Sequence, residues 1–204
     1  MDNSYTNEPD LKPFADFLFE VGMLHKTPRS GYQFLGSGQE SVAEHSFRTT
    51  VIGYTLARIT GAKVDRVVLM CLFHDLHEAR TGDFNYVNRL YNQTDVQKAL
   101  KHTLENTGLE EEIWDLHLEL EEVSTVEAAL AQDADQLDLI LSLKQEKDLG
   151  NAYAQKWLDC AVERLRTQKG QDLANVIMRT DHTDWWFQGP ERCWWTKGNG
   201  GCQK

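Results

Sequence analysis

The positions of apolar and polar residues follow a helical period over nearly the whole chain. One example is the set Phe14, Phe17, Leu18 and Val21, which recurs at spacings of three and four residues. That spacing is typical of one buried face of an α-helix. Similar sets begin near residues 42, 67, 95, 110, 125, 153 and 173. No alternation of apolar and polar residues is long enough to predict a strand, so the pattern predicts an all-α fold.

Capping boxes mark the beginnings of two of these helices. Ser41 is followed three residues later by Glu44, and Ser124 is followed in the same way by Glu127. In a capping box the Ser hydroxyl and the Glu carboxylate each accept a hydrogen bond from the other residue's backbone N–H. We therefore expect Ser41 and Ser124 to be N-caps. Further N-caps are expected at Asp10 and Thr94.

Two segments lack the helical pattern. Residues 25–38 contain Pro28 and three glycines, which predict a loop, and this loop is long enough to line a site. Residues 83–91 are rich in Asn and are predicted to form a second loop.

The most informative stretch is a run of seven apolar residues, 67–73, that leads directly into His74 and Asp75. Seven residues make about two helical turns, so the run is apolar on every side and is expected in the core. Buried polar groups without partners cost roughly 1–3 kcal/mol, and a metal ion would compensate for that cost. For an arbitrary His-Asp pair, the simpler interpretation is a hydrogen-bonded core histidine beside a solvated aspartate. Glu78 follows His74 by four residues and is expected on the same helical face.

Two other predicted helices supply groups of the same chemical type. His45 begins the helix after Ser41 and shares an expected inward stripe with Ile52, Leu56 and Ile59. The helix after Ser124 carries Asp133 and Asp135, and both neighbour apolar positions, so periodicity does not choose between them. Histidine nitrogens and carboxylate oxygens are the ligands of catalytic metal sites that keep a position open for water or substrate. The sequence therefore predicts a metal site between three helices.

Segments 41–46, 74–83 and 135–138 resemble the HD-domain metal-dependent phosphohydrolases. The 74–83 block and the loop at 28–32 are most similar to the branch of bacterial 5′-deoxynucleotidases and their eukaryotic relatives. The resemblance spans roughly residues 10–165. It implies a single helical bundle with the metal site between core helices, and one divalent metal ion. Mn, Co, Fe, Ni, Cu, Zn and Mg are not distinguished by such a ligand set.

Carried over residue by residue, the resemblance implies a role for each member of the motif. The implied metal ligands are His45, His74, Asp75 and Asp135. Asp133 then becomes a supporting or capping residue. Glu78 is implied as the catalytic acid or base, and Asp83 as a further catalytic group. The simpler alternative for Glu78 is an exposed carboxylate at a helix end. His77 points about 60° away from His74 on a helical wheel, so we interpret it as a supporting or surface residue.

A neutral metal centre requires a cation to attract phosphate. Two neutral histidines and two carboxylates cancel the charge of a divalent ion, so we expect Arg29 to supply the positive charge, with Lys26 as second choice. Tyr32 is a candidate for stacking on a base or sugar. The candidates for contacts with sugar hydroxyls are Glu40 and Ser41. The simpler alternatives are a surface cation for Arg29 and an aromatic at the core edge for Tyr32.

Composition limits the function classes. A formal net charge of −11 disfavours binding to nucleic-acid polymers, which requires basic contacts to phosphate. No apolar stretch approaches the roughly 18 residues of a membrane span, and residues 1–10 do not have the pattern of a signal peptide. The four cysteines are scattered, which predicts reduced thiols in a cytoplasmic protein.

These observations combine into one predicted organisation and function. We expect a flexible segment at 1–9, an HD domain at 10–180 and a tail at 181–204 that holds four of the six tryptophans. We expect this tail to pack its indole rings on the body or on a second subunit, or to form a lid or a stacking platform. The predicted activity is hydrolysis of nucleoside 5′-monophosphates, in deoxy forms, by a homodimer. The alternatives are hydrolysis of phosphodiesters or nucleoside triphosphates, and a nucleotide-binding scaffold without turnover.

Overall fold

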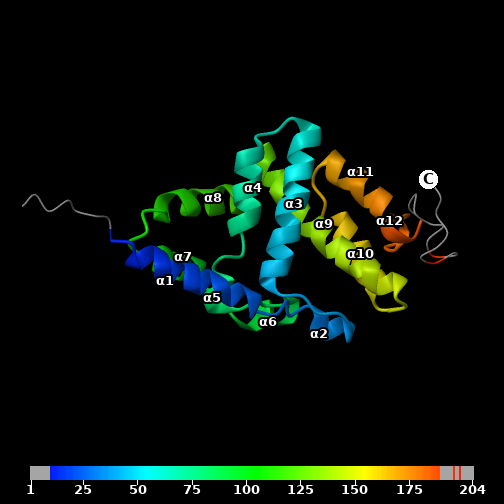
Figure 1. Ribbon diagram of the computed structural model, residues 1–204, viewed down its shortest axis with the longest axis horizontal. Helices are drawn as coiled ribbons and strands as arrows, with labels where there is room; N and C mark the ends of the chain where they lie inside the picture. Colours follow the sequence, from blue (N-terminus) through cyan, green and yellow to red (C-terminus); the bar gives the residue numbers. More distant parts are fainter. Residues whose placement is uncertain (1–9, 189–194, 196–197, 199–204) are drawn as a thin grey trace, which may run out of the picture.

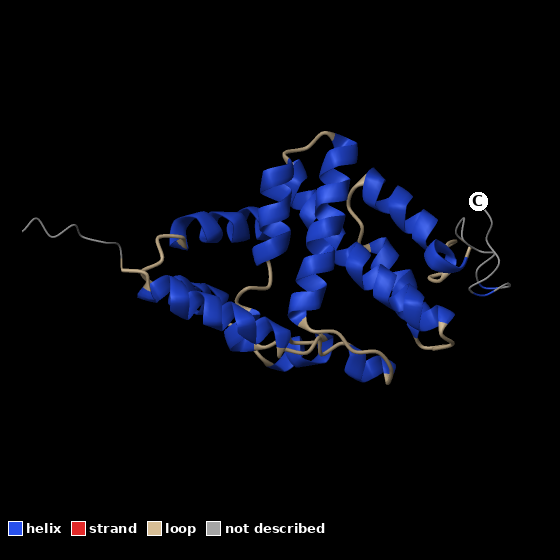
Figure 2. Ribbon diagram, in the orientation of Figure 1, coloured by secondary structure: helices blue, strands red, loops and turns tan. Residues whose placement is uncertain are grey.

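The computed structural model describes residues 10–188, 195 and 198. The expected flexible segment 1–9 and most of the tail therefore lie outside the described residues. Within them the secondary structure is helical and contains no strand, apart from an isolated bridge between Pro28 and Ser41 (Figure 2). The all-α prediction is confirmed. No helix in the described part of the chain is long and apolar enough to cross a membrane.

The helices follow one another as a series of long and short elements. In chain order they are α1 Lys12–Val21, the 3₁₀ helix η1 Gly22–His25, α2 Tyr32–Leu35, α3 Val42–Thr60, α4 Val64–Phe73, α5 Glu78–Thr81, α6 Tyr86–Tyr91, α7 Val96–Leu104, α8 Glu110–Glu122, α9 Val126–Asp148, α10 Ala154–Glu163, α11 Gln168–Ile177 and α12 Asp184–Phe187.

The long helix α9 is the centre of the bundle. It packs against α3, α4, α8, α10 and α11, with α1, α7 and α8 on one side of the molecule and α10 to α12 on the other (Figure 1). Leu137, Ile140 and Leu143 of α9 are completely buried in the main core. Burial of each such side chain contributes roughly 1.5–3 kcal/mol. This core fixes which face of α9 meets α3 and α4.

Helix α3 begins where the sequence predicts. The Ser41 hydroxyl accepts a hydrogen bond from the Glu44 N–H at 3.2 Å, and the Ser41 N–H donates to Glu44 Oε2 at 2.7 Å. The capping box places His45 one turn inside the helix, where its side chain is fully buried. Ile52 and Leu56 are buried as expected, but Ile59 is 56% exposed. The inward stripe therefore ends before Ile59, in the last turn of the helix.

Three other predicted caps are wrong by about one residue. Helix α9 is capped by Thr125, whose hydroxyl accepts from the Ala128 N–H at 3.1 Å, and the Glu127 carboxylate instead accepts from the Lys63 N–H. Asp95 replaces Thr94 as the cap of α7. At α1 the N-cap position is Leu11 and not Asp10. At α7 and α9 the neighbouring side chain reaches the free backbone N–H groups. At α1 Leu11 has no capping side chain, and Asp10 Oδ1 accepts from the Lys12 N–H at 3.0 Å.

The predicted third helix does not continue to residue 82. Helix α4 ends at Phe73, and residues 74–77 form turns before α5 begins at Glu78. The Glu78 N–H donates to the Asp75 carbonyl at 2.9 Å, a spacing of three residues instead of the four of an α-helix. His74 and Glu78 therefore do not lie one turn apart on a continuous helix. The turns at 74–77 separate the end of the apolar run, Phe73, from Glu78.

The two predicted loops each contain a short helix. Helix α6 lies within 83–91, where Asn85 Oδ1 accepts hydrogen bonds from the N–H groups of Val87 and Asn88. The 25–38 segment contains the end of η1 and all of α2. Asparagine side chains favour both loops and helix N-caps, so Asn content alone did not distinguish them.

The start of the expected tail contains α12 and an aromatic cluster. The ring centroids of Trp186 and Trp195 lie 5.2 Å apart, and Phe187 contacts both rings. Trp185 is 83% exposed. The role of the tail as strap or lid stays a prediction.

Candidate metal centre

His45 is oriented by a buried carboxylate. Its Nδ1 lies 2.7 Å from Asp138 Oδ2 on α9, so Nδ1–H donates to the carboxylate. The lone pair of the neutral ring is then at Nε2. A histidine that ligates a metal through Nε2 commonly donates Nδ1–H to a carboxylate or carbonyl in this way.

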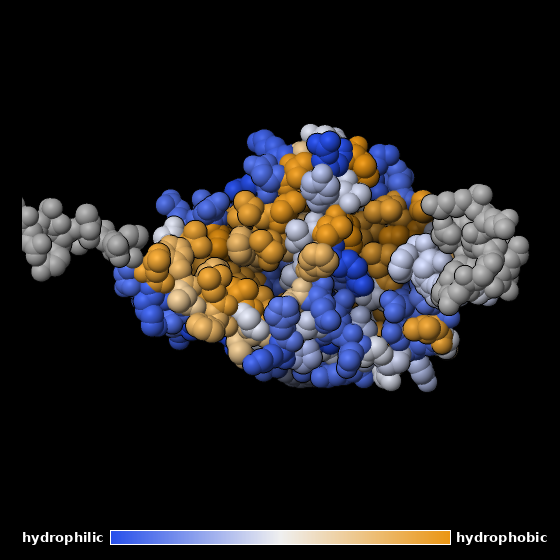
Figure 3. Space-filling view, viewed as in Figure 1, coloured by the Kyte–Doolittle hydropathy of each residue, from blue (hydrophilic) through white to orange (hydrophobic). Residues whose placement is uncertain are grey.

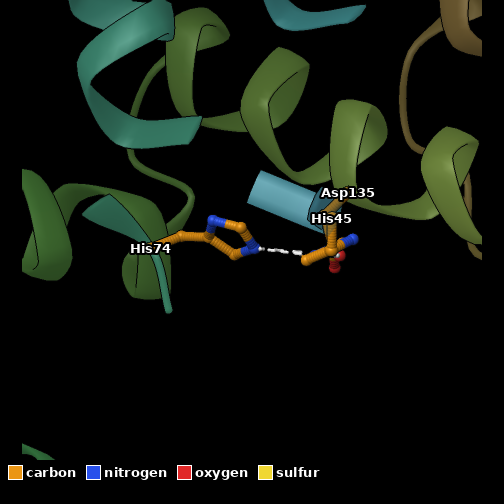
Figure 4. Close-up of side chains that lie close together, drawn as sticks. All are labelled: His45, His74 and Asp135. Carbon is orange, nitrogen blue, oxygen red and sulfur yellow. Dashed lines mark hydrogen bonds and ion pairs between the residues drawn. The ribbon is translucent and has the colours of Figure 1, made fainter. Parts of the chain in front are cut away.

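His74 presents its ring in the same manner. Its Nδ1 lies 2.8 Å from the carbonyl oxygen of Cys71 in the last turn of α4, so Nδ1–H donates to the backbone. The Nε2 atoms of His74 and His45 are 3.1 Å apart, and Figure 4 shows the His74 ring directed toward His45. Two lone pairs at this distance repel one another unless a proton or a metal ion lies between them.

Two carboxylates complete the cluster around the histidine nitrogens. Asp135 Oδ1 lies 3.2 Å from His45 Nε2 and 4.0 Å from His74 Nε2. Asp75 Oδ2 lies 3.1 Å from His74 Nε2 and 3.6 Å from His45 Nε2. With metal–ligand bonds of about 2.0–2.2 Å, neighbouring ligand atoms lie roughly 3.0–3.5 Å apart. Three of these five separations fall within that range, and the ligand atoms of His45, His74 and Asp135 all lie within 4.8 Å of one another, as expected around one divalent ion. Asp75 Oδ2 lies beside both histidine nitrogens as a further oxygen ligand candidate.

The ionisation of these groups shows that the cluster favours positive charge at its centre. Burial and Arg29 lower the pKa of His45, but hydrogen bonds to Asp135 and Asp138 raise it to about 10. Burial raises the pKa of Asp75, but His74, His45 and Arg29 reverse this effect and hold that pKa below its usual value. A divalent cation between the four side chains would supply the positive charge that the carboxylates stabilise.

The four predicted ligands are therefore brought together from α3, α9 and the turn after α4. Asp133, which periodicity did not distinguish from Asp135, faces away from the cluster. Its carboxylate accepts from the backbone N–H groups of Arg166 at 2.7 Å and Thr167 at 2.8 Å, at the start of α11. The expected capping role of Asp133 is confirmed.

Glu78 is a buried carboxyl group next to the cluster. Its side chain is 3% exposed, Oε2 has no hydrogen-bond partner, and the residue lines a cavity together with His74 and Asp75. Burial, Asp75 and Asp83 raise its pKa to about 9. Glu78 is therefore not an exposed helix-end carboxylate, and in the metal-free protein its surroundings favour the protonated form.

Arg29 and Asp83 are connected through one backbone segment. The Arg29 Nη1 atom lies 3.3 Å from Asp75 Oδ2, and the Ser30 N–H donates to Asp83 Oδ2 at 2.7 Å. The Arg29 N–H donates to the carbonyl of Glu40, which holds this loop beside the start of α3. Burial lowers the pKa of Arg29, but Asp75, Asp135 and other acidic groups raise it above its usual value. Arg29 is thus a charged group within the site.

The other predicted substrate-binding residues differ in whether they line a cavity. Tyr32 and Glu40 line a cavity of about 150 Å³ with Trp157, and Glu40 Oε1 accepts from Arg48 at 2.9 Å. Burial raises the pKa of Tyr32 to about 12. The Ser41 hydroxyl takes part in the capping box. Lys26 is exposed. Neither Ser41 nor Lys26 lines this cavity or the larger one.

The predicted metal site lies where two cavities meet. The larger cavity has a volume of about 810 Å³ and is lined by His74, Glu78 and residues from α6, α8 and α10. Asp75, Asp135 and Gln136 line both this cavity and the 150 Å³ cavity. A molecule bound at the junction therefore has access to an acid group on one side and to aromatic side chains on the other.

Comparisons with known proteins identify the family of the chain. A family model described as an HD domain matches residues 21–176. The chain belongs to the HD domain family. Its similar proteins include 5′-deoxynucleotidase HDDC2 of Danio rerio, 31% identical over 145 residues that cover 65% of this chain and 69% of that protein. Another is 5′-deoxynucleotidase YfbR of Escherichia coli, 26% identical over 70% of this chain and 80% of that protein.

Solved structures of similar proteins have the same fold. A conserved hypothetical protein from Pyrococcus furiosus is 25% identical with a TM-score of 0.68, over 81% of this chain and 99% of that one. A Pyrococcus horikoshii protein is 28% identical with a TM-score of 0.67, over 81% of this chain and 98% of that one. The family model lies within the expected HD-domain boundaries of 10–180, and those boundaries stay a prediction.

The sequence reasoning gave no role to two residues that support the HD-domain site. Asp138 orients His45, and Arg48 donates hydrogen bonds to Asp138 and to Ser142. Asp138 follows Asp135 by three residues, so both lie on one face of α9, and this spacing is a signal that the sequence contains. Arg48 follows His45 by three residues on α3. No comparable signal indicates Trp157 of α10 as a lining residue.

His77 does not ligate the predicted ion. Its ring lies 6.3 Å from that of His117, measured between ring centroids, and burial lowers its pKa. Its Nδ1 is buried without a hydrogen-bond partner. The residue lines the larger cavity, consistent with a supporting position.

Proposed function

We propose that this HD-domain protein is a metal-dependent phosphomonoesterase that hydrolyses deoxyribonucleoside 5′-monophosphates to nucleoside and phosphate. The observation that carries the proposal is the convergence of His45 Nε2, His74 Nε2 and two carboxylates at the junction of two cavities. The 5′-deoxynucleotidase names of the similar proteins support the choice of substrate.

In this proposal the chain's own residues hold the ion and leave room for substrate. His45, His74, Asp75 and Asp135 are the ligands, and Asp138 keeps His45 in the tautomer that has its lone pair at Nε2. A divalent ion bound there supplies two effects, a lowered pKa of bound water and polarisation of a phosphoryl oxygen. The side of the cluster that faces the cavities is open to water and phosphate.

Glu78 carries the proton in the proposed reaction. A water oxygen attacks phosphorus and the P–O5′ bond breaks. Glu78, whose protonated form is favoured by burial and by Asp75 and Asp83, gives a proton to the departing 5′-oxygen and takes up the proton that the water loses. The position of Glu78 beside His74 and Asp75 in the lining of the larger cavity supports this role.

The loop that contains Arg29 binds and orients the substrate in this proposal. Arg29 offsets the acidic surroundings of the phosphate, and Asp83 fixes the loop through the Ser30 N–H. The nucleoside occupies the 150 Å³ cavity beside Tyr32 and Trp157, with Glu40 available to a sugar hydroxyl. Ser41 contributes by fixing the start of α3.

The first experiment measures metal and turnover in the same preparation. Elemental analysis should find about one divalent ion per chain, and a nucleotide panel with added Mn²⁺, Co²⁺ or Mg²⁺ should release phosphate from deoxynucleoside 5′-monophosphates. Asp75→Ala should lose metal and activity. The matched control Asp115→Ala removes an exposed carboxylate of α8 and should keep both.

The outcomes separate the proposal from its alternatives. If the metal-loaded protein releases phosphate from no nucleotide of the panel, the proposal fails and the nucleotide-binding scaffold is the remaining interpretation. Faster hydrolysis of phosphodiesters or nucleoside triphosphates than of monophosphates would assign the site to another phosphohydrolase reaction.

We infer further that two copies of the chain pair through an apolar face on α1 and α3. Phe19 is 83% exposed, Leu18 67% and Phe47 72%. Val51 and Tyr54 follow Phe47 by four and seven residues on the same face of α3 and are also exposed. Figure 3 shows apolar side chains gathered over α1 and the middle of α3 and α4. Large exposed apolar patches mark interaction sites. Sedimentation analysis should give a dimer for the native chain and a monomer for Phe47→Glu. A native monomer at micromolar concentration would contradict the inference.

We also infer a reducing, cytoplasmic setting. Cys71 and Cys160 are free thiols, and free thiols persist in reducing compartments. Thiol titration of freshly isolated protein should detect them in reduced form.

A further inference from the structure

The candidate site lacks positive charge for a phosphate dianion. Two neutral histidines and two carboxylates would leave a bound divalent ion with no net charge. Arg29 is paired with Asp75 at 3.3 Å, and Asp135, Asp83 and Glu78 also act on its charge. The positive charge of Arg29 is therefore largely balanced by the acidic groups around it.

Arg89 on α6 is a second arginine at this junction. Of the basic residues in the described part of the chain, Arg89 alone lines both the 810 Å³ and the 150 Å³ cavity. It shares this position with Asp75 and Asp135, the predicted ligands that also line both. Arg29 lines only the smaller cavity, and Arg164 and Arg166 line only the larger.

The guanidinium of Arg89 is not neutralised by a carboxylate. Its Nε donates to the carbonyl of Phe84 at 2.8 Å, which leaves both Nη groups as donors. No carboxylate of the described residues forms an ion pair with it. By contrast, the arginines that do pair with Asp or Glu are Arg29, Arg48, Arg66 and Arg80. In a chain with a net charge of −11, an unpaired arginine at the junction of two cavities is available to an anionic ligand.

Contacts with α10 keep α6 at the rim of the site. The Arg164 guanidinium lies 4.7 Å from the centre of the Tyr86 ring, and the Tyr86 and Trp157 ring centroids are 6.3 Å apart. No residue of α6 is buried, so these surface contacts and the Asn85 cap hold the helix in place. Arg89 also acts electrostatically on Glu78, where its charge opposes the rise in pKa that burial causes. The charge of Arg89 therefore acts on Glu78, the residue that carries the proton in the proposed reaction.

We propose that Arg89 binds the non-bridging oxygens of the scissile phosphate, opposite Arg29. This inference rests on the proposed function for the identity of the phosphate ester. Two guanidinium N–H groups match two phosphate oxygens in a bidentate arrangement that a lysine ammonium does not reproduce. Arg89 is thus a substrate-binding residue of the site, contributed by a segment that the sequence predicted as a loop.

The test separates phosphate binding from support of the fold. For Arg89→Ala we expect kcat/KM to fall by about 10- to 100-fold, the range for losing hydrogen bonds to a charged group. Inhibition by inorganic phosphate should weaken by a similar factor, while inhibition by the nucleoside product stays unchanged. Arg89→Lys should retain part of the phosphate inhibition. Metal content by elemental analysis should match the native protein.

The matched control is Arg58→Ala, which removes an exposed arginine of α3 that lines neither cavity and should leave all values unchanged. Unaltered phosphate inhibition in Arg89→Ala overturns the inference, and so does an equal loss of phosphate and nucleoside inhibition, which indicates collapse of α6. If the native protein hydrolyses no nucleotide, the proposed function fails separately. Calorimetric titration of metal-loaded native protein and Arg89→Ala with inorganic phosphate then still decides whether Arg89 binds phosphate.

Discussion

Replacement of Glu78 by Gln should make the metal-free protein more stable while it abolishes turnover. The side chain is 3% exposed and Oε2 has no hydrogen-bond partner, so the fold accommodates the neutral carboxyl better than the carboxylate. Its pKa rises from 4.5 to about 9 on folding, through burial, Asp75 and Asp83. Gln has the same shape and no proton to lose.

The size of the effect follows from the two pKa values. Below pH 4.5 the group is protonated in both states and costs nothing. Between pH 4.5 and about 9 the unfolded chain releases the proton and the folded chain retains it, so folded-state stability falls by about 1.4 kcal/mol per pH unit. At pH 7 the native side chain therefore costs about 3 kcal/mol, which Glu78→Gln removes.

Urea unfolding at pH 5, 6, 7 and 8, followed by circular dichroism in the presence of a chelator, measures this difference. The advantage of Glu78→Gln should be small at pH 5 and should grow by about 4 kcal/mol by pH 8. A difference between variant and native protein that does not change with pH would refute the reasoning. Glu44→Gln is a control of opposite sign, because hydrogen bonds from Ser41 lower the pKa of Glu44. Glu78→Gln should bind as much metal as the native protein. Phosphate release by Glu78→Gln at the native rate would contradict a catalytic role for Glu78.

Three further substitutions test the supports of the site. Asp138→Asn should weaken metal affinity by about 10- to 100-fold, because Arg48 requires the remaining oxygen and the amide NH2 then faces His45 Nδ1, which favours the tautomer with its proton at Nε2; competition with a chelator measures this. Asp133→Ala should lower the free energy of unfolding by about 3 kcal/mol, because the N–H groups of Arg166 and Thr167 lose their acceptor; urea unfolding measures this, and an unchanged midpoint would contradict it. Ser41→Ala should cost about 1 kcal/mol through loss of the N-cap, with thermal unfolding as the assay and Ser124→Ala as a silent control.

Local chemistry was sufficient for much of the fold because helix signals act over a few residues. The periodic apolar positions predicted the long helices α3, α8 and α9, and the Ser41 capping box predicted the start of α3, which the structure confirms. The same local signals failed where two side chains compete for one role. Thr125 caps α9, and Glu127, the partner expected for Ser124, accepts a hydrogen bond from the backbone N–H of Lys63, the residue before α4.

The sequence predicted the all-α class, which the structure confirms, and resemblance to the HD family implied the set His45, His74, Asp75 and Asp135 as metal ligands. The tertiary structure decided how those groups are used. It directed Asp133 toward α11, placed Asp138 against His45 and ended α4 at Phe73. It also folded residues 86–91 into a helix beside the site. Helix periodicity fixes which face a residue occupies, but hydrogen-bond partners and charge balance come from residues far apart in the sequence. His45 and Asp138, for example, are 93 positions apart, and only the packed fold brings them together.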